Sequence, residues 1–240
     1  MGRALISRSQ FVALVLLPPI LLILGMLYIV VVLSQGRPFL YTSERMRDAE
    51  TAFRLYKIRT MTPAEGAQEM ALGGHQQSRV TAIGKVLRRT RLDELPQIFN
   101  ILKGDIGFIG PRPPLRRHVK AKRAQYQLVL RTMRPGITGL STVLVHRREE
   151  RLLAKCMSEA ETEAVYLDHC LPLKLRIDLL YASRRGFALD ILILWRTALR
   201  LMKWQPACGE ITAPQKVNIA YKDGPSEKQL ERDVALPLAA

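Results

Sequence analysis

Two adjacent carboxylates, with cations on both sides, mark residues 90–113 as the stretch of this chain where chemistry is expected. Asp93 and Glu94 stand side by side, and Arg112 follows them. The cations that precede the pair are Lys85, Arg88, Arg89 and Arg91. Cations hold phosphate groups, and carboxylates either bind a metal ion or attack phosphorus. The stretch therefore predicts chemistry on a phosphate.

The two carboxylates also have a structural interpretation. Asp93 can cap a helix that carries Pro96 in its first turn and ends at Gly104. Glu94 would then interact favourably with the dipole of that helix. A helix N-terminus is also a place where phosphate oxygens bind, so the two interpretations are compatible.

Three cations outside the run that precedes Asp93 stand out by their neighbours. Arg112 lies between Pro111 and Pro113, which fix the backbone around its guanidinium, although a surface turn would look similar. Lys57 and Arg59 are two residues apart in a predicted strand and should share one side of it. The alternative for these two residues is a solvated strand face.

The composition points to a polyanionic partner. The 240 residues carry a net charge of +16, with 48% hydrophobic residues. Nucleic acid, an anionic membrane surface and phosphorylated substrates all fit such a charge. Aromatic residues are only 6%, and the chain has no helix-turn-helix, zinc-finger or RNA-recognition signature. We therefore expect no nucleic-acid partner.

Cysteine and histidine usage predicts neither disulfides nor zinc. Cys156, Cys170 and Cys208 form no CxxC pair and are odd in number, which indicates reduced residues in a cytosolic compartment. The four histidines are equally scattered.

The N-terminal segment predicts a membrane anchor. No charge occurs between Arg8 and Arg37, and residues 11–33 are almost continuously apolar. At about 1.5 Å per residue, this segment is long enough to cross a hydrocarbon core of about 30 Å. No small-residue cleavage site follows residue 33, so we expect a retained anchor and not a secretory signal.

Pro18 and Pro19 should break or sharply kink this helix, because they remove two backbone donors and clash with the preceding turn. Positive charge flanks the segment on both sides, at Arg3, Arg8, Arg37, Arg45 and Arg47. This pattern favours a re-entrant helix-break-helix hairpin with both ends in the cytoplasm. A kinked single-pass anchor is the alternative, and either arrangement is membrane-bound.

The rest of the chain predicts a helix-dominated α+β fold. A small β-hairpin is expected from residues 38–42 and 51–61, with a polar turn at 45–50 and a mobile loop at 62–78. Helices are expected at residues 79–91, 115–133, 149–169, 173–182 and 187–203, and a short strand at 140–145. Basic residues and tryptophan along 187–203 suit a helix at a lipid interface, although core packing gives a similar pattern.

Across residues 36–202 the chain resembles the bacterial sugar transferases, which are monotopic polyprenyl-phosphate phosphoglycosyl transferases. The segments that carry the resemblance are YKIRTM at 56–61, IGKVLR at 83–88, LDELPQIFN at 92–100, KGD at 103–105, GPRP at 110–113 and RPGITGL at 134–140. Each segment is a weak signal by itself, but the set in this order and spacing is specific.

The resemblance implies magnesium-dependent transfer of a sugar 1-phosphate from a UDP-sugar to undecaprenyl phosphate, which initiates exopolysaccharide, capsule or glycan-lipid synthesis. It implies that Asp93 is the nucleophile, forming a covalent phospho-sugar intermediate, and that Glu94 binds Mg²⁺. The residues expected to bind phosphate or substrate are Lys57, Arg88, Arg112 and Arg147. Arg147 belongs to a VHR segment at 145–147, where many family members carry Asn-Gly-Arg.

The resemblance also implies a domain plan and a location. Residues 1–36 would form the re-entrant anchor, 37–205 the sugar transferase catalytic domain and 206–240 a poorly ordered tail. The catalytic domain would face the cytoplasm at the bacterial inner membrane, in contact with membrane lipid, and homo-oligomer formation is left open. A catalytically inactive membrane scaffold of a polysaccharide assembly system is the alternative function, while a membrane-tethered nucleic-acid binder would rest on the net charge alone.

Overall fold

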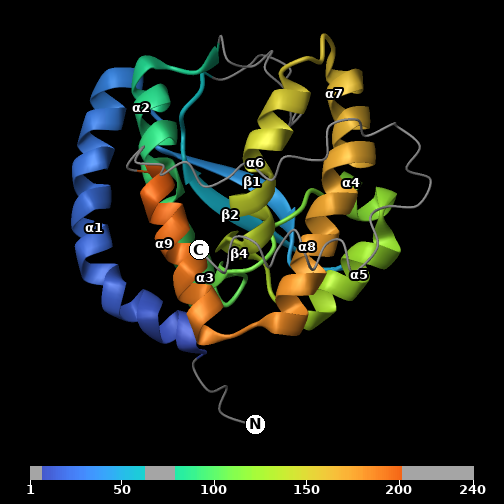
Figure 1. Ribbon diagram of the computed structural model, residues 1–240. Coiled ribbons are helices and arrows are strands. Elements are labelled where there is room, and N and C mark those ends of the chain that lie inside the picture. The colour runs from blue at the N-terminus through green and yellow to red at the C-terminus, as the bar shows by residue number, and fades with distance from the viewer. Residues whose placement is uncertain (1–6, 63–78, 202–240) are drawn as a thin grey trace. The chain divides into compact units, whose positions relative to one another are not determined.

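Figure 1 shows the computed structural model, which describes residues 7–62 and 79–201. Nearly all of the loop predicted at 62–78, and the tail predicted at 206–240, lie outside these residues. Helices dominate the described chain and are accompanied by two small two-stranded sheets, which confirms the helix-dominated α+β fold.

The apolar N-terminal segment forms one helix, α1 (Arg8–Gln35), with Pro18 and Pro19 inside it. The prolines therefore do not divide the segment into two helices. Figure 1 shows instead that α1 is bent, which is the expected result when proline rings press on the preceding turn. Ser7 caps the helix, and its side chain accepts a hydrogen bond from the backbone of Gln10.

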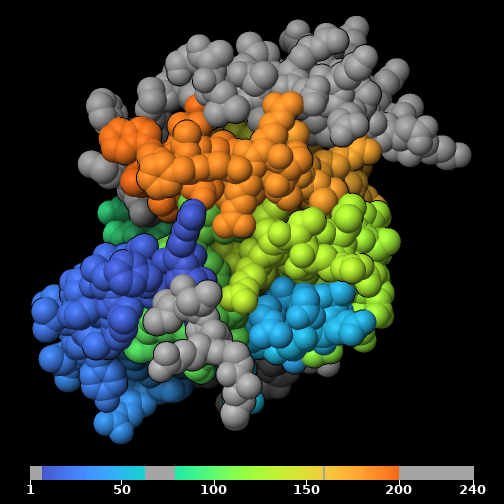
Figure 2. Space-filling model, turned by 90° about the horizontal axis from the view of Figure 1, so that it is seen from below, coloured from blue at the N-terminus to red at the C-terminus, as the bar shows by residue number. Residues whose placement is uncertain are grey.

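Most apolar side chains of α1 are exposed, and Figure 2 shows this helix (blue) uncovered on the face in view. Ala13, Leu24 and Val31 are the α1 residues buried against the rest of the fold. Such a long apolar and exposed helix is suited to lipid, and it is the one helix in the described chain that is long and apolar enough to span a membrane. The protein is therefore associated with a membrane through α1.

The predicted hairpin is present as β1 (Leu40–Met46) and β2 (Ala52–Ile58), which pair antiparallel with Leu40 opposite Ile58. The first strand extends through Met46, where a polar turn was expected, because Ser43 and Met46 are buried. The hairpin lies centrally in Figure 1, between α1 on one side and the helices labelled α5 and α8 on the other.

The carboxylate pair lies between α2 (Ala82–Thr90) and α3 (Gln97–Lys103), in the 3₁₀ turn η2 (Leu92–Glu94). Gly104 ends α3 in the left-handed conformation, as the sequence predicts. Gly84 lets α2 approach β2, because a Cβ at this position would lie 2.1 Å from the Thr60 carbonyl oxygen.

A parallel pair that the sequence did not predict follows, formed by β3 (Gly107–Ile109) and β4 (Gly136–Thr138). It places the GPRP segment, which follows β3, beside the RPGITGL segment, which contains β4. The strand predicted at 140–145 is wrong, because α6 (Leu140–Leu153) begins there. Leu140, Ser141 and Val145 are buried, and this spacing is that of one helix face.

The two long helices predicted at 115–133 and 149–169 are each interrupted. The first consists of α4 (Arg116–Ala121) and α5 (Arg123–Thr132), separated where Lys122 leaves helical geometry. In the second, Ser158 starts a new helix by accepting a hydrogen bond from the backbone of Glu161. The elements that follow are α7 (Glu159–Val165), the π-helical turn η3 (Tyr166–Cys170), α8 (Leu171–Arg184) and α9 (Phe187–Leu201).

The last helix exposes apolar side chains along one face. Phe187, Ile191, Leu194 and Trp195 are exposed and recur at helical spacing. Ile193 of the same helix is buried, so α9 both packs on the core and exposes an apolar face, and its position at a lipid interface stays a prediction.

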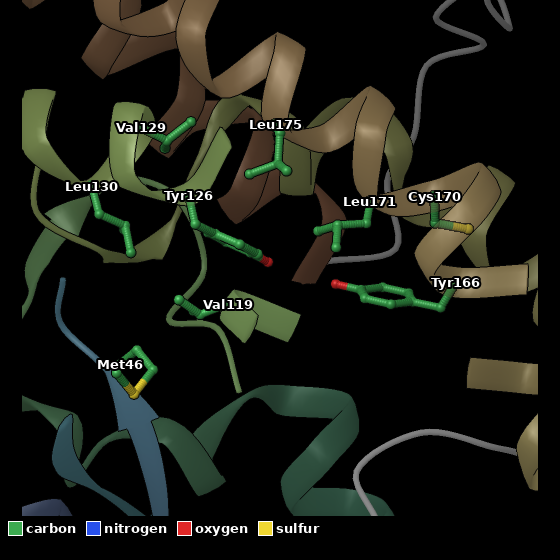
Figure 3. Close-up of a cluster of buried hydrophobic side chains, with 9 residues drawn as sticks. All are labelled: Met46, Val119, Tyr126, Val129, Leu130, Tyr166, Cys170, Leu171 and Leu175. Atoms are coloured by element: carbon green, nitrogen blue, oxygen red, sulfur yellow. The ribbon is translucent and has the colours of Figure 1, made fainter. Parts of the chain in front are cut away.

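Three clusters of apolar side chains hold the described part of the fold together. Figure 3 shows the cluster that α4, α5, η3 and α8 build around Tyr126, Val129 and Leu175. A second cluster lies between α1, the hairpin and α3, where Ala13 packs with Ile98 and Ile101. A third cluster joins Val31 of α1 to Ile58 and Leu87. The stretch around Asp93 lies on the second and third clusters, against the membrane helix.

Candidate active site

The carboxylates lie in a tight turn that the backbone itself creates. Arg91 ends α2 in the left-handed conformation, with φ at 59°, and the chain turns there into η2. Asp93 and Glu94 are 6% and 8% exposed. The capping role expected for Asp93 is wrong: among the described residues no side chain caps η2 or α3 by a hydrogen bond, and Pro96 occupies the N-cap of α3. Asp93 lies inside the turn and faces inward.

Three cations converge on one oxygen of Glu94. The distances to Glu94 Oε1 are 3.1 Å from Lys57 Nζ, 3.3 Å from Arg91 Nη1 and 3.2 Å from Arg112 Nη2. The cations come from β2, from the end of α2 and from the segment after β3. Residues far apart in the sequence thus meet at one carboxylate.

These three cations determine the protonation state of the Glu94 carboxylate. Burial alone would raise the pKa of Glu94, but Arg112, Lys57 and Arg91 outweigh burial and lower it to about 2. Lys57 responds in the opposite sense, because burial lowers its pKa, Glu94 offsets only part of that effect and Arg112 adds to the lowering. The cluster therefore holds more positive charge than Glu94 alone neutralises.

The environment of the Asp93 carboxylate differs from that of Glu94. Its Oδ1 is buried and has no hydrogen-bond partner among the described residues. Burial raises the pKa of Asp93, Glu94 adds to the rise, and Lys57, Arg91 and Arg88 oppose it. A buried carboxylate oxygen without a hydrogen-bond donor lowers the stability of the fold, and such atoms are often found at functional sites.

The other predicted site residues divide into two groups. Arg88 donates from Nε to Thr60 Oγ1 at 2.9 Å, and its charge acts on Asp93. Arg147 is exposed on α6, and in the described chain it makes no hydrogen bond or ion pair. The structure brings Lys57, Arg88 and Arg112 to the carboxylates but does not link Arg147 to them.

Backbone hydrogen bonds hold Arg112 in place. Gly136 N donates to Pro111 O at 2.9 Å, and Gly110 N donates to Thr138 O at 2.8 Å. A Cβ on Gly110 would lie 2.3 Å from the Arg134 carbonyl oxygen, so glycine is what allows this approach. The Pro-Arg-Pro segment is thus fastened to β4, with its arginine directed at Glu94.

Two residues of the site lie in segments that the sequence analysis singled out but received no role of their own. Arg91 belongs to the basic run, and its spacing of three residues from Glu94 was the signal that it contacts Glu94. Asn100 is fully buried; it accepts from Tyr56 N at 3.1 Å and donates to Arg54 O at 2.8 Å. It fastens α3 to β2 beside Lys57, and no local sequence signal marks that role.

The carboxylates fit a magnesium ion only together with a substrate. No group of three or more histidine, cysteine, aspartate or glutamate residues in the described chain forms a preformed metal site. Mg²⁺ usually keeps several waters and is held by one or two carboxylates and by substrate phosphates. Asp93 and Glu94 match that sparse donor set, and among the described residues no hydrogen-bond donor competes with a metal ion for Asp93 Oδ1.

Comparison with known proteins agrees with this arrangement. A family model described as bacterial sugar transferase matches residues 6–204, so the chain belongs to the bacterial sugar transferase family. The match covers the anchor, the carboxylate pair and the cations around it.

Individual relatives point to one kind of enzyme. The chain is 30% identical over 197 residues to UDP-N-acetylgalactosamine-undecaprenyl-phosphate N-acetylgalactosaminephosphotransferase from Aeromonas hydrophila, covering 81% of this chain and 42% of the relative. It is 34% identical over 156 residues to UDP-glucose:undecaprenyl-phosphate glucose-1-phosphate transferase from Klebsiella pneumoniae, covering 64% and 33%. It is 33% identical over 128 residues to undecaprenyl-phosphate galactose phosphotransferase from Salmonella typhimurium, covering 45% and 26%. The chain thus spans less than half the length of these relatives.

Proposed function

We propose that this protein transfers a sugar 1-phosphate from a UDP-sugar to undecaprenyl phosphate and so initiates the synthesis of a membrane-linked glycan. The unpartnered, buried carboxylate oxygen of Asp93, next to a Glu94 that three cations already occupy, carries the proposal. The names of the relatives support it, since each pairs undecaprenyl phosphate with a sugar phosphotransferase or a sugar-1-phosphate transferase. Those names differ in the sugar.

In the first step, a carboxylate oxygen of Asp93 attacks the β-phosphorus of the donor. An Asp93 O–P bond forms, the bond from that phosphorus to the bridging oxygen breaks, and UMP leaves with the electron pair. In the second step, an oxygen of the lipid phosphate attacks the same phosphorus and releases the Asp93 carboxylate. Two displacements let a soluble donor and a lipid acceptor use one site in turn.

The surrounding residues make this attack feasible. A carboxylate and a diphosphate repel each other, and the excess positive charge around Glu94 reduces that repulsion. We assign phosphate binding to Lys57, Arg88 and Arg112, and propose Arg147 as a more distant substrate contact. Glu94 would hold Mg²⁺, which supplies further positive charge at the donor phosphates when bound.

We propose a one-sided placement of α1 at the cytoplasmic face of the inner membrane. Both ends of α1 bond to the same folded unit: Gln10 Nε2 donates to Leu102 O at 3.0 Å, and Arg59 Nη2 donates to Gln35 O at 2.5 Å. A helix of 28 residues is about 42 Å long. If α1 crossed the bilayer, one of its ends would be carried away from this unit. The contacts support a re-entrant anchor with both ends on one side.

The proposal is tested with membranes that contain the full chain. These are incubated with Mg²⁺, undecaprenyl phosphate and a panel of sugar-labelled UDP-sugars. We expect label in organic-extractable lipid and release of UMP with at least one donor. If no donor of the panel transfers label, the proposed function is wrong and the inactive-scaffold alternative is favoured.

A further inference from the structure

The C-terminal end of α1 is held by a buried arginine. Arg59 is 9% exposed, and its Nη2 donates to the carbonyl oxygens of Gln35 at 2.5 Å and of Gly36 at 2.6 Å. The last carbonyls of a helix have no partner within the helix, so a guanidinium is well suited to bind them. Arg59 therefore fixes the end of the membrane helix to the strand that carries Lys57.

Gln35 extends this contact to a second element. Its Nε2 donates to Arg59 O at 2.6 Å, and its Oε1 accepts from Thr81 Oγ1 at 2.8 Å. Thr81 is the N-cap of α2, where its hydroxyl accepts from Gly84 N at 3.0 Å. The last residue of the membrane helix is thus bonded both to the exit of β2 and to the start of α2.

The same elements hold the guanidinium that acts on Asp93. Thr81 N donates to Thr60 O at 3.1 Å, and Thr60 Oγ1 accepts from Arg88 Nε at 2.9 Å. Arg88 is exposed, so without this bond its long side chain would sample several rotamers. Holding Nε leaves the two terminal nitrogens of the guanidinium for an anion.

We propose that Gln35 and Thr60 are positioning residues, which connect the docked end of the membrane helix to Arg88 and so set the affinity of the site for the donor diphosphate. Hydrogen bonds join every step from Gln35 through Thr81 and Thr60 to Arg88. The inference rests on the proposed function for the identity of the anion. It adds that the donor site is complete only when the C-terminal end of α1 is docked.

The test measures binding of UDP by calorimetry to the purified full chain in lipid nanodiscs. Thr60→Val removes the acceptor of Arg88 at nearly constant volume, and we expect about tenfold weaker binding from the loss of one hydrogen bond to a charged group. Thr60→Ser keeps the hydroxyl and should bind UDP within about twofold of the original protein. Gln35→Ala should weaken binding about threefold, because it acts through more than one bond.

Gln10→Ala is the matched control. It removes the hydrogen bond to Leu102 O at the other end of α1, far along the helix from Gln35. If loosening α1 in general weakened the site, this variant would match Gln35→Ala. We expect unchanged UDP affinity instead, and an equal loss in both variants would overturn the inference.

A double-mutant cycle separates positioning from general damage. In an Arg88→Ala background, Thr60→Val should have no further effect on UDP affinity, because its partner is gone. Additive losses, or a Thr60→Val protein that binds UDP as tightly as the original, would overturn the inference. An original protein that neither binds UDP nor transfers label would contradict the proposed function itself, which is a separate result. Thr60→Val decides the role of Thr60 by itself, and Thr81→Ala, which removes the hydroxyl that bonds to Gln35 Oε1, tests the link to α1 if Gln35→Ala does not fold: unchanged UDP affinity in Thr81→Ala would overturn that link.

Discussion

Two buried ion clusters in this molecule look alike and behave differently. Lys57 Nζ lies 3.1 Å from Glu94, and Lys174 Nζ lies 3.0 Å from Glu149, which joins α8 to α6. The two lysine side chains are 19% and 12% exposed. Burial lowers both pKa values, but Tyr166 and Glu149 outweigh burial and raise the pKa of Lys174, whereas the pKa of Lys57 remains lowered.

The neighbours of each pair explain the difference. Lys174 lies near the hydroxyl of Tyr166 and over the face of its ring, and the carboxylate of Glu149 neutralises its charge. Lys57 shares its glutamate with Arg91 and Arg112, and the adjacent Asp93 has an oxygen without a hydrogen-bond partner among the described residues. In the α6–α8 cluster Lys174 has both a carboxylate and a tyrosine hydroxyl as partners, which is typical of a pair that serves the fold, and the nearby buried Asp178 has its pKa raised rather than cations gathered around it. The cluster around Glu94 is incomplete, with excess cations and a bare carboxylate oxygen, and is suited to a phosphate substrate.

Asp93→Asn gives the largest contrast between the clusters. If Asp93 is the nucleophile, this change should reduce transfer of label to lipid at least about 10³-fold, because the amide cannot form the phosphoryl bond. Glu149→Gln, the equivalent neutralisation in the other cluster, should reduce the rate less than about tenfold. Intact mass of acid-quenched protein should show a phospho-sugar adduct with the original protein and none with Asp93→Asn. Full activity of Asp93→Asn would exclude this nucleophile.

Glu94→Gln should have the next largest effect. It removes the charge that balances Lys57, Arg91 and Arg112 and the proposed magnesium ligand, so we expect about a 100-fold lower transfer rate. The rate should also require a higher magnesium concentration, as measured by titration of the metal. An unchanged magnesium dependence would argue against Glu94 as the ligand.

The contributions of Glu94 and Asp178 to the free energy of unfolding should change with pH in opposite directions. The pKa of Glu94 is lowered from 4.5 to about 2, so the stability that it contributes is present above pH 4.5 and is lost as the pH falls towards 2. Asp178, on the α8 side, is buried, and its pKa is raised from 3.8 to about 7, with Ser141 and Lys174 opposing. It binds a proton more tightly in the folded state, so its contribution is present below pH 3.8 and is lost as the pH rises through 7.

Asp178→Asn isolates that second effect. We expect the variant to unfold at a temperature a few degrees higher than the original protein at pH 8, and the difference to shrink towards pH 4. Thermal unfolding in nanodiscs across this range provides the measurement. A difference that is constant with pH would mean that Asp178 does not titrate in this window.

Arg91 should give the smallest effect. Its side chain is 38% exposed, so its ion pair with Glu94 is worth at most about 1 kcal/mol, or about fivefold in rate. Arg91→Gly and Arg91→Ala should therefore lower transfer by a similar small factor. Glycine should be the more stable of the two by about 0.5–1 kcal/mol in denaturant unfolding, because the backbone φ is 59°. Equal stabilities would show that the left-handed backbone there is not strained.

The sequence predicted the parts of this fold that depend on local signals. The hairpin, the helix before Asp93 and the glycine stop at Gly104 follow from alternation, helical periodicity and left-handed preference. The convergence of Lys57 and Arg112 on Glu94 was anticipated only through resemblance to a family, since no spacing rule joins residues that lie so far apart in the chain.

The errors arose where tertiary contacts decided the outcome. The segment at 140–145 has the composition of a strand, but burial against neighbouring helices makes it helical. The short pairing of β3 with β4 gives no alternation to detect over three residues. Asp93 seemed a helix cap because Pro96 and Gly104 frame a helix, but the left-handed Arg91 shifts Asp93 into a 3₁₀ turn. The sequence therefore did not predict the turn that buries Asp93 Oδ1.

The buried positions of α1 have a consequence for how this protein can be made. Ala13 packs with Phe53 and Ile98, and Val31 lies in a cluster with Ile58 and Leu87. The membrane helix thus supplies part of the hydrophobic interior of the folded unit. A chain shortened to begin after Gly36 would leave those surfaces open to water and would aggregate rather than give a soluble catalytic fragment. Biosynthesis must therefore bring insertion into lipid and folding of the catalytic unit to completion together.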